Sequence, residues 1–248
     1  MNKIIFEVIA SSIQDALNAK NGGADRIELL TSIHLGGLSA TPSMVKLVKK
    51  KCDINIAAMV RPRGGGFFYT ELEKELMFLE AEDLIKSGAD GIVFGFLNED
   101  ASIDEENTKK MIDLIHSYKK EAVFHRAIDC TKNYESSIKL LINLGIDRIL
   151  TSGQKDKVID ALDLIKSIQE KYENKIQILV GSGITDENVK QIIDSTNVKQ
   201  IHSSCKTYNY DCTSNSNSNL TFDYNEKNGF EANDTDKIKA ISNILKNY

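Results

Sequence analysis

One phrase recurs three times along the chain and places a glycine just ahead of a short apolar run. Its copies are Asn21–Leu29 (NGGADRIEL), Lys86–Phe94 (KSGADGIVF) and Asn143–Leu150 (NLGIDRIL). Glycine tolerates the left-handed conformation that ends many helices, so each copy predicts a helix end followed by a tight turn into a strand. Repeated alternation of helix and strand predicts a parallel β-sheet with crossover helices.

The whole chain follows this alternation. Short apolar runs predict eight strands, Ile4–Val8, Arg26–Leu30, Asn55–Val60, Gly91–Gly95, Ala122–Arg126, Arg148–Thr151, Ile176–Gly181 and Gln200–Ser203. Helical patterns lie between and after them, at Ile13–Lys20, Ser43–Lys51, Glu71–Lys86, Glu105–Lys119, Ser136–Asn143, Val158–Tyr172, Glu187–Asp194 and Thr235–Lys246. Eight such units favour a closed barrel over an open sheet. We therefore expect an α/β protein, a single-domain (β/α)8 TIM barrel over residues 1–248.

One stretch departs from the alternation. The segment Thr213–Asn219 is a run of polar, low-complexity sequence that cannot bury apolar area. The sequence therefore predicts an irregular loop at about residues 206–233, before the last helix.

Composition excludes several classes of function. The net charge of −5 and the pI near 5.5 argue against a nucleic-acid-binding surface. No apolar stretch approaches the roughly 20 residues that span a bilayer, so we expect no membrane association. Four cysteines occur without CxxC spacing, which indicates neither a zinc site nor a disulfide scaffold. Glu7 interrupts the first apolar run and no cleavage site follows, so a reducing, cytoplasmic location is expected.

Charged and polar side chains gather at the predicted strand ends, which form the binding face of a TIM barrel. Charges in such places are costly to bury unless they are paired or serve a ligand. The set comprises Glu7, Glu28, Arg61, Arg63, His125, Arg126, Asp129, Thr151, Ser152, Gly181–Gly183 and His202–Ser204.

Two features of this set predict an anion site. The segment Arg61–Gly66 (RPRGGG) follows an apolar strand with two guanidinium groups and three glycines that allow a ligand close to the backbone. The loops that begin at Gly181, Ser182 and Gly183 and at His202, Ser203 and Ser204 follow the seventh and eighth strands, where barrels commonly hold phosphate. We expect a small anionic ligand there, with Arg126 and Ser152 assisting. The alternatives are structural ion pairs for the arginines and a tight turn for the glycines.

A second group suits proton transfer. His125 and Asp129 follow the fifth strand, and Glu7 and Glu28 face them across the predicted barrel mouth. Such groups carry general acid–base chemistry when their pKa values are driven apart. The alternative is that Glu28 pairs with Arg61 and that the histidines are ordinary core residues.

At these positions the chain resembles the CutC family, named for copper homeostasis. The phrases that carry the resemblance are Glu7-Val8, Asn21–Leu29, Gly36–Leu38, Thr41–Ser43, Arg61–Gly65, Phe124–Ala127, Leu150–Gln154 and His202–Ser204. The resemblance extends from the first strand to about Ser204. It implies a cytoplasmic (β/α)8 barrel, a homo-oligomer in many cases, that is linked to copper handling and has no settled enzymatic activity.

The chain departs from that family where copper would be expected. Relatives discussed as copper binders have cysteines after the first two strands, where this chain has Ile9 and Leu30. Cu(I) prefers sulfur ligands, so the remaining metal candidates are His125, His202 and Cys205. Two hypotheses follow: a copper homeostasis protein that binds metal or makes a regulatory contact, and a barrel enzyme for a small anionic or carbohydrate-like substrate. The sequence assigns no cofactor beyond this implied copper.

Overall fold

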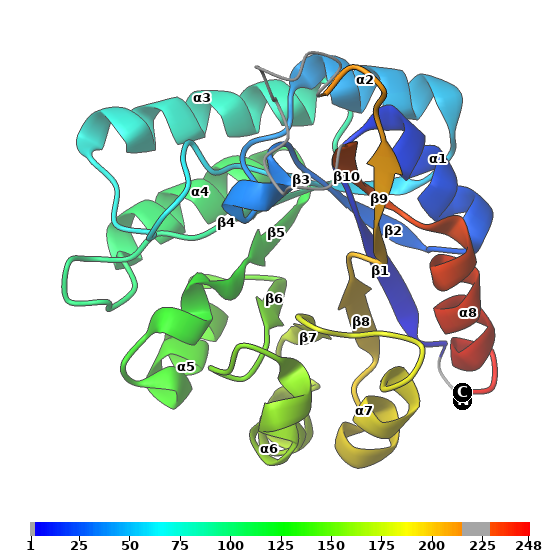
Figure 1. The fold of residues 1–248 in the computed structure, drawn as a ribbon. Helices are drawn as coiled ribbons and strands as arrows, with labels where there is room; N and C mark the ends of the chain where they lie inside the picture. Colours follow the sequence, from blue (N-terminus) through cyan, green and yellow to red (C-terminus); the bar gives the residue numbers. More distant parts are fainter. Residues whose placement is uncertain (1–2, 215–228) are drawn as a thin grey trace.

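Eight parallel strands close into a barrel in a computed structural model that describes residues 3–214 and 229–248 (Figure 1). The strands follow one another around the barrel in chain order, and the first pairs with the eighth. Their bounds are Ile5–Ala10 (β1), Arg26–Leu29 (β2), Asn55–Met59 (β3), Gly91–Phe94 (β4), Glu121–Phe124 (β5), Arg148–Thr151 (β6), Gln177–Val180 (β7) and Gln200–Ser203 (β8). The predicted fold class, a single-domain (β/α)8 barrel, is confirmed.

The helices lie outside the barrel wall (Figure 1). Their bounds are Ile13–Gly22 (α1), Pro42–Lys51 (α2), Glu71–Lys86 (α3), Glu105–Ser117 (α4), Tyr134–Leu144 (α5), Leu162–Tyr172 (α6), Val189–Thr196 (α7) and Thr235–Leu245 (α8). Predicted bounds differ by a few residues. The largest differences are the predicted helix Val158–Tyr172, whose first turn is a 3-10 helix over Val158–Ala161, and α7, which begins after Asn188.

The recurring phrase has two structural roles. Its glycine adopts a left-handed conformation in each copy, at Gly23, Gly88 and Gly145, as predicted. The aspartate that follows accepts a hydrogen bond from a backbone N–H near the start of the preceding strand, which ties neighbouring strands together at the N-terminal end of the barrel. The pairs are Asp25 with Phe6 at 3.0 Å, Asp90 with Ile56 at 2.9 Å and Asp147 with Ala122 at 2.8 Å.

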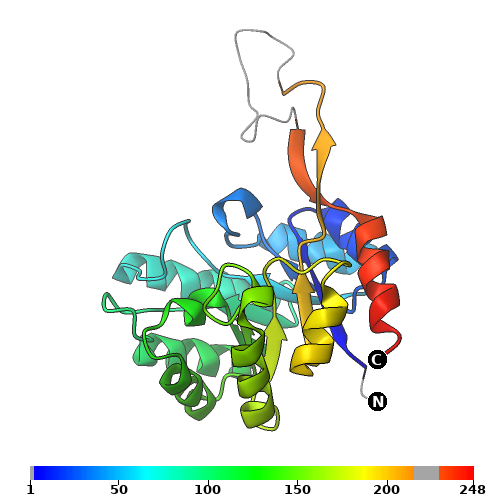
Figure 2. The same ribbon diagram turned by 60° about the horizontal axis from the view of Figure 1, so that its bottom comes forward.

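The predicted loop at residues 206–233 is wrong at both of its ends. Lys206–Tyr210 (β9) and Gly229–Asn233 (β10) form an antiparallel hairpin that rises above the barrel (Figure 2). Asn233 anchors it, because its backbone N–H donates to Asp15 Oδ1 at 3.0 Å and its side chain donates to the Asp15 carbonyl at 2.9 Å. The polar composition of the middle of the segment hid these strands. Most of the low-complexity run, from residue 215, lies outside the described residues.

Side chains pack on both sides of the barrel wall. Apolar side chains such as Phe6, Ile27 and Ile201 pack between the barrel wall and the helices. Near the C-terminal mouth, the barrel interior is apolar, with Leu30 and Met59 in a small cluster. Below that cluster, the interior contains charged side chains, and these position the site.

Candidate functional site

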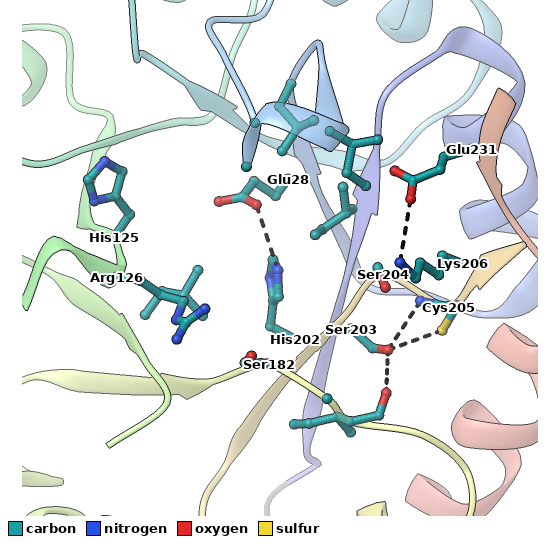
Figure 3. Close-up of a pocket in the computed structure, with 18 of the residues that line it drawn as sticks. Glu28, His125, Arg126, Ser182, His202, Ser203, Ser204, Cys205, Lys206 and Glu231 are labelled. Atoms are coloured by element: carbon teal, nitrogen blue, oxygen red, sulfur yellow. Dashed lines mark hydrogen bonds and ion pairs between the residues drawn. The ribbon is translucent and has the colours of Figure 1, made fainter. Parts of the chain in front are cut away.

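A pocket of about 810 Å³ opens at the C-terminal mouth of the barrel. This volume suits a small organic ligand. Figure 3 shows Glu28 and His202 in the middle of the pocket, His125 and Arg126 on one side, and Ser203 and Cys205 on the other. The predicted site residues that line it are Glu28, Arg61, His125, Arg126, Gly183, His202, Ser203, Ser204 and Cys205.

Other predicted site residues lie outside this lining: Glu7, Arg63, Asp129, Ser152 and Gly181. Glu7 lies deeper because β1 runs to Ala10, two residues beyond its predicted end, so Glu7 is in the middle of the strand. Gly181 packs against His202, since a Cβ there would lie 3.0 Å from the His202 Cδ2 atom. These residues support the pocket from behind.

Glu7 is the centre of a charged network inside the barrel. Its carboxylate accepts hydrogen bonds from Arg26 Nε and, at 2.8 Å, from His202 Nδ1. Arg148 lies 4.0 Å away on the other side. Burial raises the pKa of Glu7, but Arg26, His202 and Arg148 outweigh it and hold that pKa far below its usual value. Glu7 therefore stays ionised and orients His202.

Glu28 and His202 form a pair on the floor of the pocket. Glu28 Oε2 lies 3.7 Å from His202 Nε2, while Glu28 Oε1 has no hydrogen-bond partner among the described residues. Burial raises the pKa of Glu28 to about 7, an effect that Glu7 increases and His202 opposes. Burial would lower the pKa of His202, but Glu28 and Glu7 raise it. A carboxyl with a pKa near 7 beside a histidine suits acid–base chemistry at neutral pH.

This pairing predicts how stability depends on pH. Because the pKa of Glu28 is about 7 in the folded protein and near 4.5 when unfolded, the folded state binds more protons between these values. The stability from this group is full below pH 4.5 and is lost as pH rises through 7. Chemical unfolding at pH 5 and pH 8 measures this effect. Between these two pH values, the free energy of unfolding of wild type should fall by about 3 kcal/mol more than that of Glu28→Gln. An equal difference at both pH values would contradict the raised pKa.

His125 is held in one tautomer. Its Nδ1 accepts a hydrogen bond from the Ala127 N–H at 3.1 Å, so in the neutral ring Nε2 carries the hydrogen. Nε2 has no partner among the described residues. Burial, and then Arg61 and Arg126, lower the pKa of His125 to about 3. The ring is therefore a neutral hydrogen-bond donor, and Phe67 packs against it with the ring centroids 4.7 Å apart.

Arg61 and Arg63 serve the loops that surround them. The Arg61 guanidinium donates to the carbonyl oxygens of Leu35, Gly36 and Gly37 at 3.0–3.2 Å and to that of Gly65 at 2.5 Å. Arg63 pairs with Glu73 at 2.5 Å, outside the pocket. The ion-pair alternative therefore describes Arg63. Arg61 is instead held by backbone carbonyls, and its Nε has no hydrogen-bond partner among the described residues. Backbone acceptors of this kind leave no pattern in a sequence.

Asp129 is bound on several sides within its loop. It accepts hydrogen bonds from Thr151 Oγ1 at 2.5 Å, from the Ser152 N–H and Oγ at 2.9 Å, and from the Gln154 N–H at 3.2 Å. Arg126 Nε donates to the same carboxylate at 3.1 Å. Asp129 thus joins the segment after β5 to the loop after β6 and fixes Arg126 at the pocket rim.

Residues of the loops after β7 and β8 line one side of the pocket. Ser203 Oγ donates to the Ile184 carbonyl at 2.8 Å and accepts from the Cys205 N–H at 3.2 Å, which joins the two loops. Gly183 has a positive φ of 73°, which allows the chain to turn at the rim. The geometry agrees with the predicted position of a ligand-binding loop, and an anion there stays a prediction.

The described residues contain no group of three His, Cys, Asp or Glu side chains that could hold a metal ion. Cys205 is buried beside Ser203, and burial raises the pKa of its thiol to about 11. No helix in the described part of the chain is long and apolar enough to cross a membrane.

Sequence reasoning missed the groups beneath the pocket. Arg26 and Arg148 occupy the same place in two copies of the recurring phrase, directly after the aspartate. A charged residue inside a buried apolar strand indicates an internal ion pair, so this signal was present. It also missed Lys206 and Glu231 of the hairpin, which line the pocket rim.

Comparisons with known proteins agree with this architecture. A sequence model described as the CutC family matches residues 4–207. A CutC family protein of Treponema denticola is 43% identical over 202 residues, which cover 82% of this chain and 81% of the relative. The human protein named copper homeostasis protein cutC homolog is 32% identical and covers 99% of this chain and 90% of its own. The crystal structure of CutC from Streptococcus agalactiae matches with a TM-score of 0.76 and 30% identity over 81% of this chain and 98% of that one. The chain therefore belongs to the CutC family.

Proposed function

We propose that this protein contributes to copper homeostasis, and that it does so by binding a small polar molecule in the barrel-mouth pocket and moving protons on it. The names of the human and mouse relatives support the first part. The second part is carried by one observation, the buried Glu28–His202 pair with a free carboxylate oxygen on the pocket floor. A buried polar group without a partner is costly, and a bound ligand would supply the partner.

The pocket rim carries charges of both signs. Arg126, Lys206 and Lys237 line it, and so do Asp186, Glu187 and Glu231. Lys206 pairs with Glu231, whereas the Arg126 side chain is 41% exposed and uses its Nε and Nη2 within its own loops, which leaves Nη1 for a ligand. Arg126 therefore supports the anionic or carbohydrate-like substrate that the sequence predicts.

The residues present do not fit copper well. Cu(I) prefers thiolate and thioether sulfur. The sulfur-containing residues that line the pocket are Met59 and Cys205, and burial keeps the Cys205 thiol protonated by raising its pKa to about 11. Ile9 and Leu30 offer no ligand atom. We therefore place the link to copper in the chemistry of the pocket and not in metal ligation.

Complementation of a bacterial strain that lacks its own CutC family protein tests the proposal. Wild type and Cys205→Ser should restore growth in copper to the same level, because the thiol has no assigned role. Glu28→Gln should fail to restore it, because the amide cannot take up a proton. Growth curves across copper concentrations, with immunoblots to equalise protein amounts, provide the measurement.

Direct copper binding is the outcome that would contradict this. In competition with a chromogenic Cu(I) chelator, nearly all of the metal should stay on the chelator. Stoichiometric retention by the protein that Cys205→Ser abolishes, together with failure of that variant in growth, would assign the function to metal ligation.

We further propose a cytoplasmic homo-oligomer, as the family resemblance implies. One face of α3 exposes Leu72, Leu76 and Leu79, which lie one turn apart and are 78%, 45% and 58% exposed. Exposed apolar side chains at this spacing form a stripe that an assembly would cover.

A further inference from the structure

Three buried side chains that line the pocket have hydrogen-bonding atoms that the described protein does not use. One atom is Nε of Arg61, whose other guanidinium nitrogens donate to loop carbonyls. The other two are Oε1 of Glu28 and Nε2 of His125, in residues that are 2% and 4% exposed. The two residues approach the pocket from different strands, β2 and the end of β5, and Figure 3 shows His125 across the pocket from the hairpin side with Glu28 between. Native proteins rarely leave such atoms unpaired without a ligand, a water or a strained role.

The two atoms differ in chemical character. His125 Nε2 carries a hydrogen, because Nδ1 is occupied by the Ala127 N–H, so it can only donate. Glu28 Oε1 is an acceptor whenever the carboxylate is ionised. A ligand that satisfies both must therefore offer a hydrogen to Glu28 and an oxygen lone pair to His125.

The surroundings of Glu28 allow it to act as a base. The groups that face it are His202 from β8, Glu7 from β1, Arg148 from β6 and Arg26 from β2. The two cations, Arg26 and Arg148, are balanced by the carboxylates of Glu7 and Glu121. The charge on the pocket floor is therefore set by the Glu28–His202 pair. Burial gives Glu28 a pKa of about 7, which is near the value that is most effective for proton transfer at neutral pH.

The pocket around these groups is apolar at the depth where they act. Ile9, Leu30 and Met59 line it there. Apolar walls exclude water and strengthen hydrogen bonds to a developing charge. A carboxylate base and a neutral imidazole donor between apolar walls are one arrangement that supports enolisation of a carbonyl compound.

We propose that the pocket binds an α-hydroxy carbonyl compound, from which Glu28 removes the proton on the carbon next to the carbonyl while His125 donates a hydrogen bond to the carbonyl oxygen. This rests on the proposed function of the pocket as a proton-transfer site for a small polar molecule. It adds the substrate class and the reaction, which is an isomerisation.

The step balances within the site. The C–H bond breaks and its proton goes to Glu28, while its electron pair forms the C=C bond of an enolate. The carbonyl π pair moves to the oxygen, where His125 Nε2–H stabilises the charge. The proton of the neighbouring hydroxyl then passes to the former carbonyl oxygen, and Glu28 returns its proton to the former carbonyl carbon. A new carbonyl forms at the carbon that lost its hydrogen and the Glu28 carboxylate is regenerated, so no electron donor or acceptor is needed.

Deuterium exchange tests the reaction directly. The purified protein is incubated in D2O with dihydroxyacetone, dihydroxyacetone phosphate or D-ribulose 5-phosphate, and proton NMR follows loss of the signal next to the carbonyl. Wild type should exchange at least one probe faster than buffer, with a rate that rises through a pH of about 7 as Glu28 ionises. Glu28→Gln should lower the rate by about 100-fold or more. His125→Asn should lower it by about 100- to 1000-fold, since asparagine can still accept from the Ala127 N–H but lacks Nε2–H.

Controls separate this result from a folding defect. Glu106→Gln changes an exposed carboxylate on α4 that does not line the pocket, and should exchange like wild type. Glu28→Asp keeps a carboxylate and should retain more exchange than Glu28→Gln at equal melting temperature. Exchange at the buffer rate for all three probes, or an unchanged rate in Glu28→Gln, would overturn the inference. The complementation experiment in copper tests the proposed function separately, and its outcome does not depend on either of these results.

Discussion

Replacing Arg148 by alanine should lower the free energy of unfolding by roughly 3–5 kcal/mol, the range seen when one partner of a buried ion pair is removed. The Arg148 side chain is fully buried inside the barrel. Its Nη1 donates to Glu121 Oε1 at 2.8 Å, and Nη2 lies 2.8 Å from Glu121 Oε2. The substitution leaves a cavity and removes a cation from both Glu121 and Glu7. Urea unfolding at pH 7, monitored by circular dichroism, measures the change.

Two further variants show whether charge or volume is responsible. Arg148→Met fills much of the space without a charge, so it should recover part of the loss but remain less stable than wild type. Lys110→Ala breaks an exposed ion pair with Glu106, at 2.6 Å, and should not differ measurably from wild type. If Arg148→Met were as stable as wild type, the interior charges would not need this cation, and the account of the network would be wrong.

The sequence predicted the barrel because its signals are local and repeated. A glycine that adopts a left-handed conformation, such as Gly23 or Gly145, ends a helix regardless of its distant neighbours. An apolar run then gives a strand, and eight such units leave few ways to bury their faces. The hairpin at β9 and β10 was missed because it is held by a contact from Asn233 to Asp15, 218 positions away.

The candidate site was predicted in part. Strand-end position correctly placed Glu28, His125 and His202 at one pocket, because the ends of parallel barrel strands meet on one face. Strand-end position could not show which role each of these residues has. Whether a guanidinium faces a ligand or a ring of carbonyl oxygens, as Arg61 does, depends on the path of a loop and not on residue type. Glu7 and Glu28 likewise look alike in sequence, and their pKa values are driven apart only by neighbours from other strands.

Asp129 offers a direct test of that distinction, because the sequence groups it with the acid–base residues and the structure surrounds it with donors. Asp129→Asn replaces one acceptor oxygen by an NH2 group. In one orientation this group faces the Thr151 hydroxyl and the Gln154 N–H, and in the other it faces the Ser152 N–H and hydroxyl and Arg126 Nε. Buried donors then lose their partner. We expect the free energy of unfolding to fall by about 2–4 kcal/mol, since hydrogen bonds to a charged group contribute more than neutral ones.

The deuterium-exchange assay shows whether Asp129 has only a structural role or also takes part in the reaction. If Asp129 only joins the loops after β5 and β6, Asp129→Asn should retain the exchange rate within a few-fold per folded molecule, whereas Glu28→Gln loses it at little cost in stability. Asp113→Asn, an exposed carboxylate on α4, is the matched control and should change neither quantity. An Asp129→Asn protein with wild-type stability and no exchange would place Asp129 in the chemistry. The loop after β6 would then have to move when substrate binds, because Ser152 and Gln154 donate to that carboxylate and Asp129 does not line the pocket.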